Sequence, residues 1–290
     1  MKTQSKPTQS KPTQSKPNVQ AATQNVKHPA KYATWPRETN HRDKILQHLE
    51  DLKLKIPHEA IDQIVRESTE KSYNVWEILE RFLAIPSGLK HEQAITSRIR
   101  RANFPTESTL ESYDWSFNPS AQRQAQVMEL ATGEFVRRNE NVTFVGKSGL
   151  GKTHIMEGLG KRCCVAGYRV LYIKSGHLIE LLNKSRAIKS LPQQVRKIRA
   201  FDLLVIDEFG FEKLERREIS DALSLLYKVI DARVGRSTAV ITNVDFKDWT
   251  DYLGDPQIVM AMLDRLVYRS QIIKFDGKSY RAASRPENAK

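Results

Sequence analysis

Five short runs of nearly continuous apolar residues lie between residues 141 and 275, and amphipathic stretches separate them. The runs are NVTFVG (141–146), YRVLYIK (168–174), FDLLVIDE (201–208), STAVITN (237–243) and SQIIKF (270–275). Helical spacing of apolar residues is found between them, near 152–166, 176–187, 190–199, 214–233 and 256–268. Strands that are buried on both faces carry such continuous runs, so the pattern predicts an α/β domain with a five-stranded parallel sheet covered by helices.

Residues 41–104 show a helical period instead. Their apolar positions lie mostly three or four residues apart, which predicts a small all-α domain. These positions are Ile45, Leu49, Leu52, Ile61, Ile64, Val65, Val75, Ile78, Leu79, Phe82, Leu83, Ile95 and Ile99. Pro57 and Pro86 stand where we expect helices to start or stop, because proline cannot continue the hydrogen-bond ladder of a helix. The segment 104–120 carries alternating aromatic residues and is expected to be an ordered connector.

The first 17 residues contain three copies of the unit TQSKP, which has a lysine and a proline but no large apolar side chain. Such a segment cannot bury a core, so residues 1–40 are predicted to form a disordered basic tail. A passive tail is the simpler interpretation, and a DNA-binding arm is the alternative. The predicted organisation is therefore a tail at 1–40, a helical N-terminal domain at 41–104 and an α/β domain at 105–290.

The charge of the chain points to a polyanionic partner. Its 290 residues include 47 Lys and Arg against 34 Asp and Glu, which gives a formal net charge of +13. Such an excess favours nucleic acid as the partner, with a merely solvated basic surface as the alternative.

Neither export nor a metal centre is indicated by composition. No uninterrupted apolar run of about 18 residues is present, and the first residues lack the apolar region of a secretory signal. We therefore expect no membrane partner and a cytoplasmic location. Cys163 and Cys164 are sequence neighbours, which suits neither a disulfide framework nor a metal site, so we expect reduced thiols packed in a helix.

The segment GKSGLGKT follows the first apolar run directly and precedes a predicted helix. It satisfies the G-x-x-x-x-G-K-[ST] pattern of a phosphate-binding loop in the structural context that this motif requires. Backbone N–H groups can surround the phosphates, and the helix directs the positive end of its dipole at them. Lys152 is expected to span β- and γ-oxygens, and the Thr153 hydroxyl to bind Mg²⁺. The predicted ATP-binding residues are Gly146, Lys147, Ser148, Gly149, Leu150, Gly151, Lys152 and Thr153.

Polar side chains stand at the ends of two further predicted strands. Asp207 and Glu208 end the third run, at the carboxyl edge where ligands of open α/β sheets bind. Asp207 is expected to hold Mg²⁺ through water, and Glu208 to orient or deprotonate the attacking water. Asn243 ends the fourth run and can bridge the γ-phosphate and this water, although a polar strand terminus is the alternative.

These motifs, in their order and spacing, resemble a known family. GKSGLGKTH, LLVIDEFGF, AVITN and MLDRLVYRSQIIKFDGKSYR are similar to the IstB-like helper ATPases of insertion-sequence transposons, which are relatives of DnaC-type helicase loaders among AAA+ proteins. The similarity extends over about residues 41–285. It implies an AAA+ P-loop ATPase that assembles head-to-tail as a homo-oligomer on double-stranded DNA and recruits or activates its partner transposase.

Position by position, the resemblance implies that Lys152 and Thr153 form the Walker A pair. It also implies that Asp207 and Glu208 form the Walker B pair and that Asn243 is the sensor 1 residue. Arg265, in LDRL, falls where AAA+ proteins keep the arginine finger that reaches the γ-phosphate of the neighbouring subunit. Arg269 is the second candidate, and a solvated or paired arginine is the alternative. Few residues follow the last run, so a C-terminal lid and its sensor 2 residue are expected to be absent. The neighbouring subunit or the N-terminal domain is then expected to close the pocket.

Between the second and third predicted strands, residues 174–199 carry seven basic residues against a single acidic one. Initiator-like AAA+ proteins place an extra helix that faces DNA at this point. Lysine and arginine contact phosphates, so we expect duplex binding with little sequence specificity and strong salt dependence. No aromatic residue lies among them, which disfavours stacking on single strands, and a solvated face is the alternative. The expected contacts are Lys184, Arg186, Lys189, Arg196, Lys197 and Arg199.

The leading hypothesis is an ATP-controlled DNA-binding helper of a transposase. A loader of a replicative helicase is the closest alternative, because the N-terminal domain does not identify its partner. A small-molecule phosphotransferase is disfavoured by the net charge and by Glu208 and Asn243, which suit activation of water. A non-catalytic DNA-binding protein is disfavoured by the pair Asp207 and Glu208.

Overall fold

The computed structural model describes residues 40–210 and 221–283, so the predicted tail lies outside it apart from its last residue. The chain divides into two compact units, Met1–Pro57 and His58–Lys290. The first contains helix α1 (His41–Asp51). Within the described ranges, no helix has the length and apolar character needed to cross a membrane.

The second unit contains the sheet. Its strands are β1 (Asn141–Gly146), β2 (Val170–Lys174), β3 (Leu203–Phe209), β4 (Ser237–Thr242) and β5 (Ser270–Phe275). Its longer helices are α2 (His58–Glu70), α3 (Val75–Ala102), α4 (Ala121–Leu130), α6 (Lys152–Val165), α7 (Ser175–Ala187), α8 (Leu191–Arg199), α10 (Ala222–Ala232) and α12 (Pro256–Val267). The short ones are α5 (Glu134–Arg137), the 3₁₀ turn η2 (Phe246–Asp248), α11 (Trp249–Leu253) and α13 (Tyr280–Ala283).

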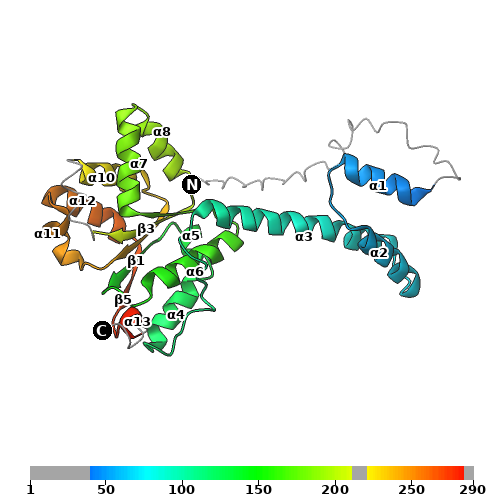
Figure 1. The fold of residues 1–290 in the computed structure, drawn as a ribbon, viewed down its shortest axis with the longest axis horizontal. Coiled ribbons are helices and arrows are strands. Elements are labelled where there is room, and N and C mark those ends of the chain that lie inside the picture. Colours follow the sequence, from blue (N-terminus) through cyan, green and yellow to red (C-terminus); the bar gives the residue numbers. More distant parts are fainter. Residues whose placement is uncertain (1–39, 211–220, 284–290) are drawn as a thin grey trace, which may run out of the picture. The chain divides into compact units, whose positions relative to one another are not determined.

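The five strands form one sheet in the order β2-β3-β4-β1-β5, and every neighbouring pair is parallel. The predicted five-stranded parallel sheet is thus confirmed. Because all strands run in the same direction, β3, β4 and β1 end side by side at one edge of the sheet (Figure 1). Two helices also begin at this edge: α6 after the loop that follows β1, and α7 directly after β2.

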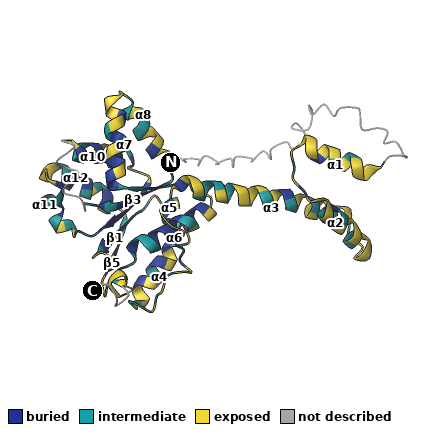
Figure 2. Ribbon diagram, in the orientation of Figure 1, coloured by how far each residue is buried: buried dark blue, intermediate teal, exposed yellow. Residues whose placement is uncertain are grey.

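The inner strands β1, β3 and β4 are buried between two apolar layers and carry mostly the colour of buried residues in Figure 2, whereas the edge strand β5 is partly exposed. One layer contains α6 with parts of α4 and α5, and the other contains α7, α8, α10 and α12. Cys163 and Cys164 are buried in the first layer as free thiols, as predicted. Burial raises the pKa of the Cys163 thiol to about 12, so this sulfur stays protonated and unreactive.

Helix α3 runs without interruption through Pro86, so the expectation that a helix starts or stops there is wrong. Asn74 begins the helix with a capping box, in which Glu77 returns the hydrogen bond. Proline removes one hydrogen bond from a helix of 28 residues, and the packing of α3 on α6 and β2 offsets that loss. Pro57, in contrast, lies directly before α2, as expected.

Because α3 packs on α6 and β2, the helices α2 and α3 belong to the same compact unit as the sheet. This unit begins earlier than the predicted domain boundary at residue 104. The boundary at residue 104 stays a prediction, because it concerns whether residues 41–104 fold independently of the α/β domain. Helices α4 and α11 were not predicted, since each is short and has only a few apolar positions.

Candidate active site

The phosphate-loop motif lies between β1 and α6, at the sheet edge where β3 and β4 also end. Gly149 and Gly151 both have a φ of 82°, a left-handed conformation that other residues rarely adopt. A Cβ atom at Gly149 would collide with Ser279, and one at Gly151 would collide with the ring of Tyr113. Glycine is therefore required at both positions by the backbone and by close neighbours.

Lys152, the first residue of α6, is almost fully buried and points back into the loop. Its Nζ donates hydrogen bonds to the carbonyl oxygens of Gly146 and Lys147, at 2.6 and 2.7 Å, and to Oδ1 of Asn243 at 2.7 Å. Burial lowers the pKa of Lys152 to about 8, although the charge of Asp207 acts in the opposite direction. This ammonium group is thus a buried cation whose partners are neutral oxygens, which phosphate oxygens can replace.

Asp207 is held by three donors at the end of β3. Its Oδ2 accepts hydrogen bonds from the Tyr172 hydroxyl at 2.5 Å and from Thr153 Oγ1 at 3.1 Å. Its Oδ1 accepts one from the backbone N–H of Glu208 at 2.7 Å. The threonine hydroxyl and the carboxylate thus converge on one point, and such hard oxygen donors suit Mg²⁺. In the described ranges no cluster of three or more His, Cys, Asp or Glu forms a metal cage, which is usual where phosphates and water supply the other ligands.

Sequence analysis did not identify Tyr172, because a tyrosine inside an apolar strand pattern resembles any core residue. The side chain is 2% exposed, and its ring packs edge-on against Phe104. Burial, together with the neighbouring Asp207, raises the pKa of Tyr172 and keeps the hydroxyl as a donor. Tyr172 therefore orients the carboxylate that could hold the metal.

Replacing Tyr172 by phenylalanine should lower the Mg²⁺ affinity of the site by about 10- to 100-fold, because Asp207 loses the hydrogen bond that orients its carboxylate. The ring and its packing are retained, so the fold should be unchanged. The measurement is a Mg²⁺ titration of nucleotide binding, followed by fluorescence, with Tyr168→Phe as the matched control. An unchanged Mg²⁺ midpoint in Tyr172→Phe would contradict this role.

Glu208 lies next to Asp207 but is held differently. Its φ is +57°, which is uncommon for a residue with a side chain, and the pairing of β3 with β4 is irregular at this point. Its Oε1 accepts a hydrogen bond from Lys174 Nζ at 2.8 Å, from the end of β2. Glu208, the carboxylate predicted to activate water, is thus ion-paired with Lys174, the first basic residue of the segment 174–199.

A cavity of about 410 Å³ adjoins these residues. Lys152, Thr153, Asp207, Glu208 and Asn243 all line it, so the structure brings these predicted site residues together. Sequence analysis missed the other walls, which come from the connector and from the segment after β5. These residues include Thr106, Ser112, Tyr113, Phe117, Asn118, Tyr280 and Arg281.

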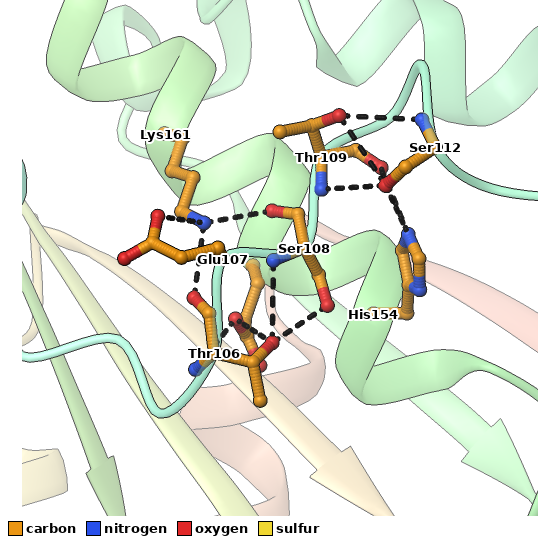
Figure 3. A network of polar contacts seen from close by, with 8 residues as sticks. Thr106, Glu107, Ser108, Thr109, Ser112, His154 and Lys161 are labelled. Atoms are coloured by element: carbon orange, nitrogen blue, oxygen red, sulfur yellow. Dashed lines mark hydrogen bonds and ion pairs between the residues drawn. The ribbon is translucent and has the colours of Figure 1, made fainter.

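The connector is fastened to α6 by a network of polar contacts (Figure 3). Lys161 Nζ donates to the carbonyl oxygens of Thr106 and Ser108, at 3.0 and 2.9 Å. Two turns nearer the loop, the His154 ring lies 3.1 Å from Ser112 Oγ. The connector is ordered, as its alternating aromatic residues predicted, but that signal did not identify it as a wall of the cavity. The connector and the segment after β5 thus form part of the pocket wall, and closure by a neighbour or the N-terminal domain stays a prediction.

Arg265 does not line this cavity. Its Nε donates to Asp231 Oδ1 at 2.7 Å, and its guanidinium lies 5.0 Å from the centre of the Tyr227 ring. The structure therefore keeps the predicted arginine finger apart from its own subunit's phosphate loop. Contact of Arg265 with a neighbouring subunit stays a prediction.

The six predicted DNA contacts are all exposed and lie on α7, α8 and the turn between them. Lys184 pairs with Glu180, and Arg186 pairs with Asp221. Across the described ranges, Lys189, Arg196 and Lys197 have no acidic partner within salt-bridge distance. These three side chains thus offer uncompensated positive charge to a ligand.

The comparison with known proteins agrees with this site. Residues 47–288 match the family described as IstB-like ATP binding protein. A protein described as ATP-binding in insertion sequence IS21 of Pseudomonas aeruginosa is 32% identical over 232 residues, which cover 79% of this chain and 86% of that protein. Its counterpart in IS232 of Bacillus thuringiensis subsp. berliner is 27% identical over 243 residues, which cover 83% of this chain and 95% of that protein. The solved structure of a DnaC helicase loader aligns at 21% identity with a TM-score of 0.44, over 58% of this chain and 97% of the loader.

The family match covers most of the described residues, including the phosphate loop and both strands that end in its polar partners. The chain therefore belongs to the family of IstB-like ATP-binding proteins.

Proposed function

We propose that this protein is the ATP-dependent DNA-binding helper of a transposon, which assembles on duplex DNA and recruits or activates its transposase while hydrolysing ATP. One observation carries the proposal: α7, the first of two exposed basic helices, begins at the sheet edge that holds the phosphate-loop site, and the ion pair Lys174–Glu208 lies at this junction. The insertion-sequence relatives support a role in transposition.

The chemistry follows from the side chains around the cavity. Lys152 leaves its backbone carbonyl partners and binds β- and γ-phosphate oxygens. Thr153 and Asp207 would hold a Mg²⁺ ion, which would neutralise charge on the phosphates. Glu208 orients the attacking water once its bond to Lys174 is released, and Asn243 positions the γ-phosphate.

Binding of DNA is assigned to α7 and α8. Their uncompensated cations suit the regularly spaced phosphates of a duplex, whose contacts release counterions and carry no base specificity. The same phosphates can draw Lys174 away from Glu208, so DNA should stimulate hydrolysis. Head-to-tail assembly as a homo-oligomer would place Arg265 of one subunit beside the γ-phosphate of the next, once it leaves Asp231.

Replacing Lys189, Arg196 and Lys197 together by alanine should weaken binding to every duplex sequence. It should also flatten the dependence of log affinity on log salt by roughly 2 to 3, because about 0.9 of a counterion is released per phosphate contact. Fluorescence anisotropy at several salt concentrations measures this slope. The charge-matched control removes Arg137, Arg138 and Arg162, which are exposed and ion-paired elsewhere on the molecule. Equal salt slopes for the two triple variants would show that DNA does not bind at α7 and α8.

The transposase assignment requires its own test. Immobilised full-length protein, loaded with DNA and a non-hydrolysable ATP analogue, should retain the transposase of its own element. Retention should be lost in the triple variant because the protein no longer assembles on DNA. Retention of a replicative helicase in place of the transposase would instead favour the loader function.

A further inference from the structure

Helix α6 carries a buried carboxylate that the phosphate-loop motif does not include. Glu157 is 0% exposed and stands four residues after Thr153, so the two side chains lie on the same face of the helix. Both residues line the nucleotide cavity. Sequence analysis missed Glu157, because a single acidic residue in a helix usually faces solvent.

One oxygen of this carboxylate is paired and the other is not. Oε2 of Glu157 accepts hydrogen bonds from the hydroxyl and the backbone N–H of Thr106 in the connector, at 2.8 and 3.2 Å. Oε1 is buried and has no hydrogen-bond partner among the described residues. Most buried polar atoms of proteins are paired. An orphaned carboxylate oxygen on a residue that lines a cavity therefore points to a partner that comes with the ligand.

The charge of Glu157 also lacks a direct counterion. In the part of the chain that the structure describes, no Lys, Arg or His lies within salt-bridge distance of it, and Lys161, one turn further along α6, pairs with Glu107. Burial raises the pKa of Glu157, although the hydrogen bonds from Thr106 and the charge of Lys161 act in the opposite direction. A buried carboxylate without a counterion is costly, and buried charges in proteins are usually paired or bound to metal ions.

A metal ion fits this cavity on independent grounds, because Thr153 Oγ1 and the Asp207 carboxylate converge there. Mg²⁺ keeps several water molecules when it binds to proteins, and these water molecules donate hydrogen bonds to nearby acceptors. The charge of Glu157 also acts on the hydroxyl of Tyr172, which donates to Asp207. Burial and the charge of Asp207 raise the pKa of Tyr172 most, and Glu157 raises it further.

We propose that Glu157 is a further positioning residue of the metal site, and that its Oε1 accepts a hydrogen bond from a water molecule of the Mg²⁺ ion that Thr153 and Asp207 would hold. This inference rests on the Mg²⁺ site of the proposed function. It supplies the missing partner of Oε1 and a positive charge near the buried carboxylate. Because Oε2 stays on Thr106, one side chain then joins the metal ion to the connector.

Glu157→Gln tests the proposal, because glutamine has nearly the same shape and its carbonyl oxygen can keep both hydrogen bonds from Thr106. The probe is Mn²⁺ in place of Mg²⁺, added to the full-length protein with a non-hydrolysable ATP analogue. Electron paramagnetic resonance measures the Mn²⁺ that stays free. The Mn²⁺ affinity should fall by about 10-fold or more, the usual effect of removing a side chain that holds a metal-bound group in place. Affinity for the analogue in EDTA should not fall, because the carboxylate has no metal to serve there.

Glu107→Gln is the matched control, since it makes the same change at a fully exposed carboxylate of the connector and should leave the Mn²⁺ affinity at the wild-type value. Unchanged Mn²⁺ affinity in Glu157→Gln, an equal loss in Glu107→Gln, or an equal loss of analogue binding in EDTA would each overturn the proposal and leave Glu157 as an anchor of the connector alone. Metal binding requires neither DNA nor transposase, so failure of the transposon function would not affect this measurement. Wild-type protein that binds no Mn²⁺ with the analogue would overturn the Mg²⁺ site as well.

Discussion

Alanine in place of Lys152 should weaken ATP binding by about 30-fold or more. Removal of one partner from a buried charge contact costs about 2–5 kcal/mol, and the triphosphate would be left without its buried cation. The Lys152 ammonium is almost fully buried and has only neutral oxygens as hydrogen-bond partners, so its charge is held in place for an anion. Fluorescent nucleotide titration measures the affinity.

Glu208→Gln is the matched comparison in this experiment. It should retain ATP binding, because Glu208 does not contact the phosphate loop and glutamine can still accept a hydrogen bond from Lys174. Hydrolysis should fall by about 100- to 10,000-fold through loss of the general base, and the protein should stay on DNA longer. If both variants lost nucleotide binding equally, the division of roles between Lys152 and Glu208 would be wrong.

Arg265→Ala should fold and bind ATP but hydrolyse it about 1,000-fold more slowly or worse, as expected when an arginine finger is lost. The loss of the Arg265–Asp231 ion pair should cost little stability, because exposed pairs contribute at most about 1 kcal/mol. Wild-type hydrolysis should rise more steeply than linearly with protein concentration, since the site is completed by assembly. Added duplex DNA should increase it further.

Mixing Arg265→Ala with Lys152→Ala protein is the decisive measurement. The first variant supplies an intact nucleotide pocket and the second an intact arginine, so hydrolysis should return only in the mixture. Wild-type activity that stays proportional to concentration, together with no recovery on mixing, would exclude action across an interface. Arg269→Ala serves as the control for the second candidate arginine and should hydrolyse ATP normally.

Local sequence patterns predicted much of the fold. A strand that is covered on both faces is mostly apolar, and a phosphate loop favours glycine where φ is positive. Both requirements concern neighbours in the chain, so the five strands and the loop were found close to their observed limits. The same reasoning failed at Pro86, where long-range packing on α6 and β2 outweighs one missing hydrogen bond.

The apolar positions of the N-terminal helices illustrate a second limit. Their spacing correctly predicted helices, but Leu52, Val65 and Leu83 are exposed in the single chain. Helical period identifies an apolar face and cannot say what covers it. Tyr172 shows the converse, because an apolar pattern hides a hydroxyl that donates a hydrogen bond to the Asp207 carboxylate.

The sequence by itself determined the family, the order of the five strands along the chain, and the position of the phosphate-loop motif, because each depends on residue types at short, fixed spacing. Only the tertiary structure decided which distant segments wall the nucleotide cavity. Asn118 and Lys278 lie 160 positions apart and still share two hydrogen bonds. Such pairs arise from the folded sheet, which brings the connector and the segment after β5 to one edge, and no local pattern encodes that distance.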